Sequence, residues 1–392
     1  MGKGWSLGLL LIAEVAAMGL WFVSAAILPD LLQEVALSSA RQAALSSSVQ
    51  AGFMVGAIMS AVLGLPDRFD PRRIFAISAI LGGLFNAALL VVDPGSALSI
   101  GARFITGALL AGVYPVGMKI VVGWGKEDRG FLVGALVGAL TLGSALPHLI
   151  AFTGGANWRL AVVIASIAAA MAGLICLAIS LGPHHSTAAR FDPSVIRTAW
   201  SNRRVRLAYA GYLGHMWELY AMWAWIAVAT AASYAHSMAA ADALSFSKMT
   251  AFITIGIGAF SSVLAGFLAD RIGKAKVAMT AMVLSGLAAV LTALTFGGPV
   301  WLTFTLVIVW GLTIVPDSAQ FSALVADASP PDQAGSLMTL QTSLGFALTF
   351  VTVQATPALA AWLGWPPVLA LMALGPVFGI VAMHRLQSMD RA

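Results

Sequence analysis

Two short loops decide how this sequence folds: GLPDRFDPRR at residues 64–73 and GFLADRIGKAK at residues 266–276. Each follows an apolar block of about 20 residues, the length that crosses a bilayer as an α-helix. Asp67 and Asp270, each followed by an arginine, are 203 residues apart (270 minus 67). The same succession of apolar block and charged loop therefore occurs twice in the chain.

The composition around these loops is that of a protein immersed in lipid. Of the 392 residues, 60% are hydrophobic and 9% are charged, whereas about a quarter of a soluble domain is charged. This excludes a soluble enzyme, and the lack of alternating ten-residue segments excludes a membrane β-barrel. Neither a phosphate-binding loop nor a metal-ligand cluster is recognisable, so we expect no enzymatic activity, no cofactor and no bound metal.

Counting apolar blocks predicts twelve membrane-spanning helices. They lie near residues 7–28, 43–64, 74–92, 98–120, 130–152, 159–181, 206–232, 247–268, 276–296, 300–323, 335–357 and 366–385. The chain is therefore predicted to be an all-α membrane protein with two six-helix bundles, at residues 1–181 and 206–392. The polar, basic linker at 182–205 is either a plain connection or a short helix on the inner leaflet.

Basic residues are distributed unevenly between the two sides of this arrangement. With the N-terminus in the cytoplasm, 16 of the 21 fall inside, and only Arg41, Arg159 and Lys248 fall outside. The other two, Arg103 and Lys119, lie within the fourth span. Basic residues concentrate in cytoplasmic loops, so both termini are predicted to be cytoplasmic. This distribution also explains the net charge of +5 without a nucleic-acid partner. Compact loops rich in Arg, with much Ala and Gly in the chain, favour a bacterial inner membrane.

A second match supports an internal duplication. The segment EVAAMGLW at residues 14–21 aligns with ELYAMWAW at residues 218–225, which begins 204 residues later (218 minus 14). The offset agrees with that of the two loops to within one residue. A duplicated six-helix unit places the solute path between the two halves.

These features resemble the major facilitator superfamily of secondary transporters, which has six plus six spans and a G-x-L-A-D-R-x-G-R/K-x-R/K loop after span 2, often echoed after span 8. The second loop matches this pattern almost fully, at Gly266, Leu268, Ala269, Asp270, Arg271, Gly273, Lys274 and Lys276. The first loop keeps Asp67, Arg68, Arg72 and Arg73, but Pro66 and Asp70-Pro71 depart from the pattern. The resemblance implies the major facilitator fold and a conformational gating role for both loops. It also implies that Asp67 and Asp270 face the positive N-terminal ends of spans 11 and 5, respectively.

Five charged residues are predicted at membrane depth, where a charge costs at least about 2.5–3.5 kcal/mol unless it is paired or hydrated. They are Glu14, Arg103, Lys119, Glu218 and Asp317. Arg103 resembles the family's membrane arginine, whose role is either proton coupling or helix pairing, and Lys119 is long enough to snorkel to the surface. Asp317 follows a proline, where a broken helix would expose backbone groups to a cavity.

Glu14 and Glu218 are equivalent in the repeat, so we expect both to face one central cavity and to bind protons or solute. His215, one turn before Glu218, is placed to assist its proton exchange. The alternative role for each glutamate is a hydrogen bond between helices. The further candidates for lining the cavity are Met18, Trp21, Met222, Trp225, Tyr114, Lys119, Gln320 and Gln341.

An aromatic stripe accompanies Glu218. It consists of Trp217, Tyr220, Trp223 and Trp225, and it is either packing or a cage for an aromatic or cationic solute.

The sequence thus predicts a monomeric secondary transporter that moves a small solute by alternating access, coupled to protons as in symport. The alternatives are a facilitator or exporter without proton coupling, and a transporter-like membrane sensor without flux. The identity of the solute and the direction of transport stay open.

Overall fold

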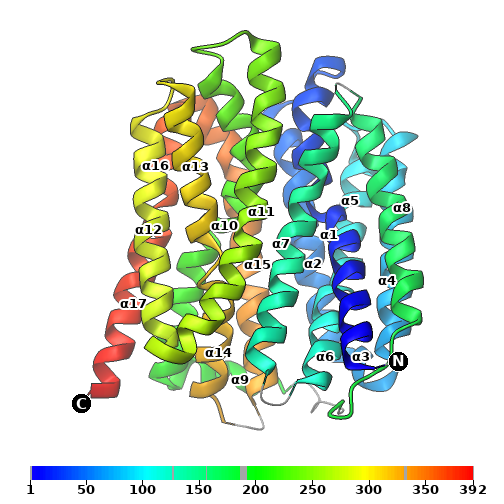
Figure 1. Ribbon diagram of the computed structural model, residues 1–392, viewed down its shortest axis with the longest axis vertical. Helices are drawn as coiled ribbons and strands as arrows, with labels where there is room; N and C mark the ends of the chain where they lie inside the picture. The colour runs from blue at the N-terminus through cyan, green and yellow to red at the C-terminus, as the bar shows by residue number, and fades with distance from the viewer. Residues whose placement is uncertain (1, 126–127, 156, 186–191, 331–332, 392) are drawn as a thin grey trace.

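The computed structural model describes residues 2–125, 128–155, 157–185, 192–330 and 333–391, apart from the side chains of Asp67, Arg129, Asp390 and Arg391. The described residues form helices and loops without a strand, which confirms the all-α prediction. The helices stand side by side in two groups, the N-terminal half (α1–α8) and the C-terminal half (α10–α17), as Figure 1 shows. Both termini lie at one end of the bundle, which we call the termini end, and the opposite end is called the far end.

The N-terminal half follows the predicted succession of spans. It comprises α1 (Lys3–Glu34), α2 (Ser39–Leu63), α3 (Leu65–Arg68), α4 (Pro71–Ala87), the 3-10 turn η1 (Ala88–Leu90), α5 (Ala97–Leu110), α6 (Tyr114–Trp124), α7 (Arg129–Thr153) and α8 (Trp158–Leu177). The predicted linker contains a short helix, α9 (Val195–Ser201), so the plain connection is wrong for that segment.

The C-terminal half repeats this order. It comprises α10 (Arg203–Tyr234), α11 (Ala240–Ile272), α12 (Lys274–Leu294), α13 (Val300–Ile314), α14 (Ser318–Ala328), α15 (Ala334–Leu363), α16 (Trp365–Met372) and α17 (Leu374–Arg391). Several of these helices extend past the predicted edges, because a helix continues beyond the apolar stretch that hydropathy detects.

Eleven stretches of the described chain are long and apolar enough to cross a membrane. The remaining predicted span, 206–232, lies in α10, which has 32 residues, as many as α1. It is less apolar than its neighbours because it carries arginines at its start, two titratable residues and many aromatic rings. Since α10 packs against α11, α15 and α17 inside the bundle, its polar residues are shielded from lipid.

The duplication is visible in the positions where helices break. The α5–α6 break covers residues 111–113 and the α13–α14 break covers residues 315–317, an offset of 204 (315 minus 111). Pro115 lies in the first turn of α6, and Pro316 lies in the second break. Proline lacks the backbone donor that would continue a helix, so both breaks have the same local cause.

Two equivalent glycines let neighbouring helices touch in the same way in each half. A Cβ on Gly107 would lie 2.1 Å from the carbonyl oxygen of Val49, and one on Gly311 would lie 1.9 Å from that of Thr254. Both distances are far below van der Waals contact, so only glycine permits this approach of α5 to α2 and of α13 to α11. Small residues at helix contacts are typical of membrane bundles.

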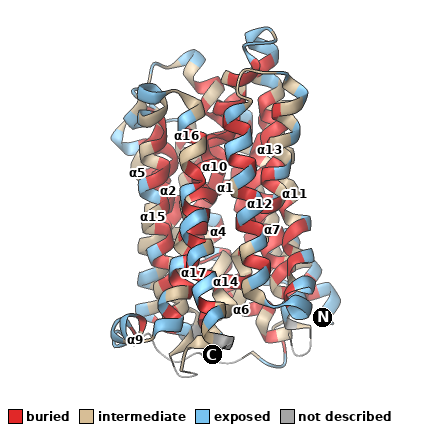
Figure 2. Ribbon diagram, turned by 90° about the vertical axis from the view of Figure 1, so that its left-hand side faces the viewer, coloured by how far each residue is buried: buried red, intermediate tan, exposed pale blue. Residues whose placement is uncertain are grey.

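The two halves meet along two seams, α7 against α11 and α2 against α15, with α1 against α10 between them. Buried residues run through the interior along the length of the bundle, and exposed residues gather at both ends and on the outer faces (Figure 2). The outer faces carry large apolar side chains such as Ile77, Leu84 and Phe378, which are 59%, 65% and 70% exposed. This exposure fits a surface covered by lipid tails.

Candidate functional site

The carboxyl group of Glu218 is held inside the C-terminal half. It accepts hydrogen bonds from Ser285 Oγ of α12 at 3.0 Å and from Trp310 Nε1 of α13 at 2.7 Å. The residue is buried. Two donors from two neighbouring helices therefore hold this carboxyl group in place, as a helix-joining hydrogen bond would require.

His215 pairs with Asp317 rather than with Glu218. Its Nδ1 lies 2.8 Å from Asp317 Oδ1, the distance of an ion pair, although the angle is not that of a hydrogen bond. Its Nε2 lies 3.0 Å from Ser318 Oγ. Asp317 and Ser318 stand at the predicted helix break, which the structure confirms. We call His215, Glu218 and Asp317 the buried titratable cluster, because all three are at most 2% exposed.

Glu14 points into the N-terminal half. Its Oε2 lies 2.6 Å from the position that a Cβ on Gly117 of α6 would take, so the glycine leaves room for the carboxyl group. Among the described residues, neither carboxyl oxygen has a hydrogen-bond partner, and Tyr114 is within electrostatic range. In this conformation Glu14 and Glu218 are separated, because each packs against helices of its own half.

Arg103 ties three helices of the N-terminal half together. Its guanidinium donates to Asn86 Oδ1 of α4 at 2.7 Å and to the carbonyl oxygens of Leu20 and Trp21 of α1 at 2.8 and 3.0 Å. The residue is fully buried, and no carboxylate is among its described partners. Of the two roles that the sequence left open, this geometry favours helix pairing.

Lys119 reaches toward the termini end. Its Nζ donates to the carbonyl oxygen of Pro66 at 2.6 Å. Pro66 belongs to α3, in the first charged loop. The side chain extends to the end of the bundle, as expected for snorkelling, and it binds the loop there.

Six aromatic side chains fill the interface between the halves near the middle of their helices. They are Trp21, Phe22 and Phe53 from the N-terminal half, and Tyr220, Trp223 and Phe346 from the C-terminal half. We call them the central aromatic cluster. Its ring centroids are 4.4–5.9 Å apart, and five of its eight ring contacts cross from one half to the other.

The predicted aromatic stripe is thereby divided. Trp217 and Trp225 donate their indole N–H groups to the carbonyl oxygens of Leu371 and Val353, at 3.1 and 3.0 Å, so they pack within the C-terminal half. Tyr220 and Trp223 instead contact rings of the N-terminal half.

Four other candidates for lining a cavity lie in the packed interior. Met18, Met222, Gln320 and Gln341 are at most 4% exposed. Met18 lies against Gly143 of α7. The side-chain amide of Gln341 has no hydrogen-bond partner among the described residues, so this polar group is buried without a partner.

The second charged loop lies against the opposite half, as the resemblance implies. Asp270 Oδ2 is 4.0 Å from the position of a Cβ on Gly130, beside the N-terminal end of α7. Gly273 has a φ of 94°, a left-handed conformation that favours glycine. Gly266 lies near the backbone of Gly130, while Arg271 is exposed.

The next helix begins with an ion pair. Lys274 Nζ lies 2.5 Å from Asp327 Oδ2 at the end of α14. This contact stays within the C-terminal half.

The first charged loop is fastened within its own half. Arg72 pairs with Asp70 at 2.6 Å and donates to the carbonyl oxygen of Ile179 at 3.0 Å, which connects α4 to the segment that follows α8. The hydrogen bond from the Arg72 side chain holds the pKa of Asp70 below its ordinary value. Arg68 and Arg73 are exposed, and the side chain of Asp67 is outside the described residues.

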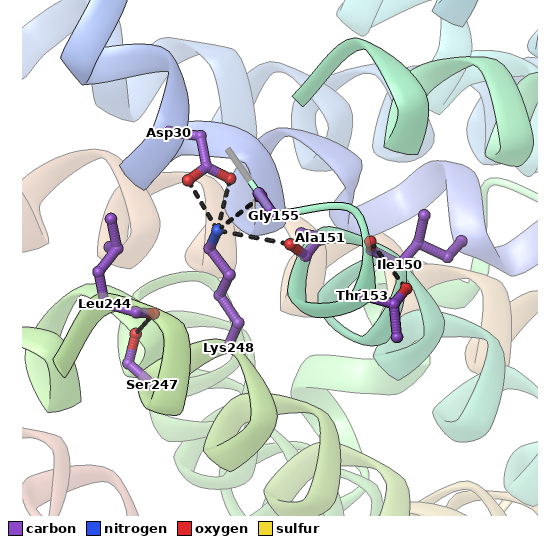
Figure 3. Close-up of polar contacts among 8 residues, drawn as sticks. All are labelled: Asp30, Ile150, Ala151, Thr153, Gly155, Leu244, Ser247 and Lys248. Atoms are coloured by element: carbon purple, nitrogen blue, oxygen red, sulfur yellow. Dashed lines mark hydrogen bonds and ion pairs between the residues drawn. The ribbon is translucent and has the colours of Figure 1, made fainter. Parts of the chain in front are cut away.

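The structure also contains an ion pair between the halves that the sequence reasoning missed. Lys248 Nζ of α11 lies 2.7 Å from both carboxylate oxygens of Asp30 in α1, and it donates to the carbonyl oxygens of Ala151 and Gly155 at 3.4 and 3.2 Å (Figure 3). Both side chains are nearly inaccessible, at 4% and 1% exposed. The only sequence signal was a lone charge at the edge of each apolar block, and for Lys248 this was interpreted as an outer-loop position.

A second contact closes the far end at the other seam. Ser47 Oγ of α2 donates to Gln354 Oε1 of α15 at 2.6 Å, and Gln354 Nε2 donates to the carbonyl oxygen of Ala40 at 3.2 Å. The two halves are thus fastened at the far end by polar contacts on both seams.

Comparison with known proteins agrees with this architecture. The family model of the Major Facilitator Superfamily matches residues 9–262. The gallate transporter of Pseudomonas putida is 35% identical over 143 residues, which is 32% of this chain and 31% of that protein. The chain therefore aligns with less than a third of that relative's length.

A solved structure extends the likeness to the whole fold. The crystal structure of the nucleoside transporter NupG (D323A mutant) superposes with a TM-score of 0.74 over 97% of this chain and 98% of that chain, at 15% identity. The fold is thus the major facilitator fold, and the family consists of transporters rather than enzymes. The chain belongs to the Major Facilitator Superfamily, a family of multi-pass membrane transporters.

Proposed function

We propose that this protein is a proton-coupled secondary transporter, in which protons bind at the buried titratable cluster. The observation that carries this proposal is that His215 and Asp317 form a buried pair beside the break between α13 and α14, with buried Glu218 one turn along α10 and within electrostatic range of Asp317. Ionised groups at membrane depth are costly and mark ion paths. The imidazole of His215 can pass a proton to the carboxyl group of Asp317, since its Nδ1 lies 2.8 Å from Asp317 Oδ1.

The helix break adds a means of coupling that proton to conformation. Asp317 belongs to the short segment that separates α13 from α14, so protonation that weakens its pairing with His215 changes a contact at a hinge. Glu218 is joined to α12 and α13 through its two donors. Proton binding thus acts on contacts between the helices of the C-terminal half.

An organic acid is the solute class that we propose. The matched segment of the gallate transporter supports this choice.

The concentration of described basic residues at the termini end, including Lys3, Arg72 and Arg203, supports a cytoplasmic location of both termini. We further propose that the protein functions as a monomer in a bacterial inner membrane.

Uptake into proteoliposomes tests this function. Radiolabelled gallate is supplied outside, with and without an imposed proton gradient. We expect saturable uptake that accumulates above equilibrium only with the gradient. Glu218→Gln and Asp317→Asn should lose this accumulation and keep solute counterflow, because each keeps side-chain size but removes titration.

The matched control is Asp242→Asn, the same kind of substitution at an exposed carboxylate in the first turn of α11. It should accumulate solute as the wild type does. Saturable uptake that does not depend on the proton gradient would identify a facilitator instead. The absence of saturable flux for gallate and for a panel of related organic acids would favour a sensor.

A further inference from the structure

We propose that the central aromatic cluster is the solute site and that it takes a planar aromatic carboxylate, held between rings of the two halves. This inference rests on the proposed transport function and names the chemistry of its solute. It is argued from three observations on the cluster: its ring contacts, its unpaired donors and the charge behind it.

The ring contacts are formed where the halves must separate during alternating access. Trp21 lies 5.7 Å from Tyr220 and 5.4 Å from Phe346, and Phe53 lies 4.4 Å from Phe346, between ring centroids. These are the separations at which aromatic rings attract one another. When the halves part, these contacts break, and a flat aromatic solute offers a ring face to each side in their place.

Two hydrogen-bond donors in the cluster have no acceptor. The indole Nε1 atoms of Trp21 and Trp223 are buried, and neither has a partner among the described residues. Buried N–H groups in native structures are nearly always paired, so two unpaired donors on rings of opposite halves indicate acceptors that arrive with a ligand. Carboxylate and phenolic oxygens are such acceptors.

A positive charge lies directly behind the cluster. The guanidinium of Arg103 donates to the backbone carbonyl of Trp21 itself, at 3.0 Å. Its other described partners are the carbonyl oxygen of Leu20 and the amide oxygen of Asn86, and neither neutralises its charge. Glu14, two turns along α1, is the nearest acidic residue on that helix, and no described hydrogen bond joins its carboxyl group to Arg103. The resulting field favours an anion over a cation.

Equilibrium binding to the purified protein in detergent tests the solute class. The three probes are 4-hydroxybenzoate, cyclohexanecarboxylate and benzylamine, measured by isothermal titration calorimetry. They separate the aromatic ring from the carboxylate: the second lacks the ring's π face, and the third replaces the anion with a cation. We expect 4-hydroxybenzoate to bind at least about tenfold more tightly than either of the others.

Substitutions test the site. Trp21→Phe and Trp223→Phe keep an aromatic ring but remove the donor, so each should weaken 4-hydroxybenzoate binding by about 10- to 100-fold, the effect of losing a hydrogen bond to a charged group. The solute-free melting temperature should change little, because no hydrogen bond is lost. Trp217→Phe is the matched control, since its donor is already bonded to Leu371, and it should bind the probe as the wild type does.

The outcomes separate this inference from the proposed function. Equal binding of cyclohexanecarboxylate, tighter binding of benzylamine, no binding of any probe, or unchanged affinity in both Trp→Phe variants would each overturn the aromatic site. None of these results depends on a proton gradient. Conversely, uptake that does not depend on the proton gradient would refute proton coupling, but it would not contradict tight, Trp-dependent binding of 4-hydroxybenzoate.

Discussion

The ion pair between Asp30 and Lys248 should control whether the far end of the transporter is open. It joins α1 of one half to α11 of the other, with both side chains buried. When the halves part there, water reaches both charges, so the pair stabilises only the conformation that is closed at the far end. Lys248→Met keeps the apolar stem but removes the charge, which leaves the Asp30 carboxylate buried without its partner.

The size of the effect follows from the burial of the pair. Removing one partner of a buried ion pair costs about 3–5 kcal/mol. Since about 1.4 kcal/mol corresponds to a factor of ten, the ratio of open to closed molecules should rise by roughly two to three and a half orders of magnitude. The double variant Asp30→Leu, Lys248→Met should return toward the closed conformation, because replacing both charges with apolar groups is often neutral or stabilising.

Pulsed electron–electron double resonance measures this change. Spin labels at Val91→Cys and Ala235→Cys report the distance between exposed positions at the far end of each half. The native thiol, Cys176, is buried and is replaced by alanine in this background. We expect a longer distance to dominate in Lys248→Met and the wild-type distance to return in the double variant. The same distance distribution in all three proteins would refute this role of the ion pair.

Three further predictions concern packing and the two loops. Gly311→Ala should lower the melting temperature in detergent, because its Cβ overlaps a backbone carbonyl and overpacking costs about 1–3 kcal/mol or more, while Gly101→Ala, with nothing within 4 Å, should not. Asp70→Asn should be less stable than the wild type near neutral pH. Because this carboxyl's pKa is lowered in the folded state, the difference should shrink as the pH falls below about 4, and a difference that persists in acid contradicts the assignment. Asp270→Asn should change the rate of conformational exchange a few-fold, since a charge at a helix N-terminus contributes about 0.3–1 kcal/mol; equilibrium solute affinity should stay constant, and Asp242→Asn, at an exposed carboxylate in the first turn of α11, should change neither.

Sequence alone predicted the helices and the duplication, because both depend on local patterns. Apolar blocks of bilayer length determined twelve spans, including α10, whose many aromatic and polar residues weaken its hydropathy. The match between residues 14–21 and 218–225 established an offset that the two helix breaks reproduce. Lipid leaves a chain no alternative to helices in which every backbone group is bonded internally, so length and apolarity suffice for this level of structure.

The site was predicted only as a set of residues. Glu218, His215 and Asp317 were each recognised as costly at membrane depth, but their pairing was not: His215 contacts Asp317, and Glu218 receives its donors from Ser285 and Trp310. Periodicity shows which face of a helix is buried only when another face is polar. A helix such as α10, buried on most sides, gives no such signal about its rotation.

The contacts between the halves were decided by tertiary structure alone. Asp30 and Lys248 are 218 residues apart, and the rings of Trp21 and Phe346 come from opposite ends of the chain. The sequence shows that these residues can form an ion pair or stack. Whether they do so depends on how the two bundles dock. That docking is set by the summed shape of many small residues along two seams, and no local pattern in the sequence encodes it.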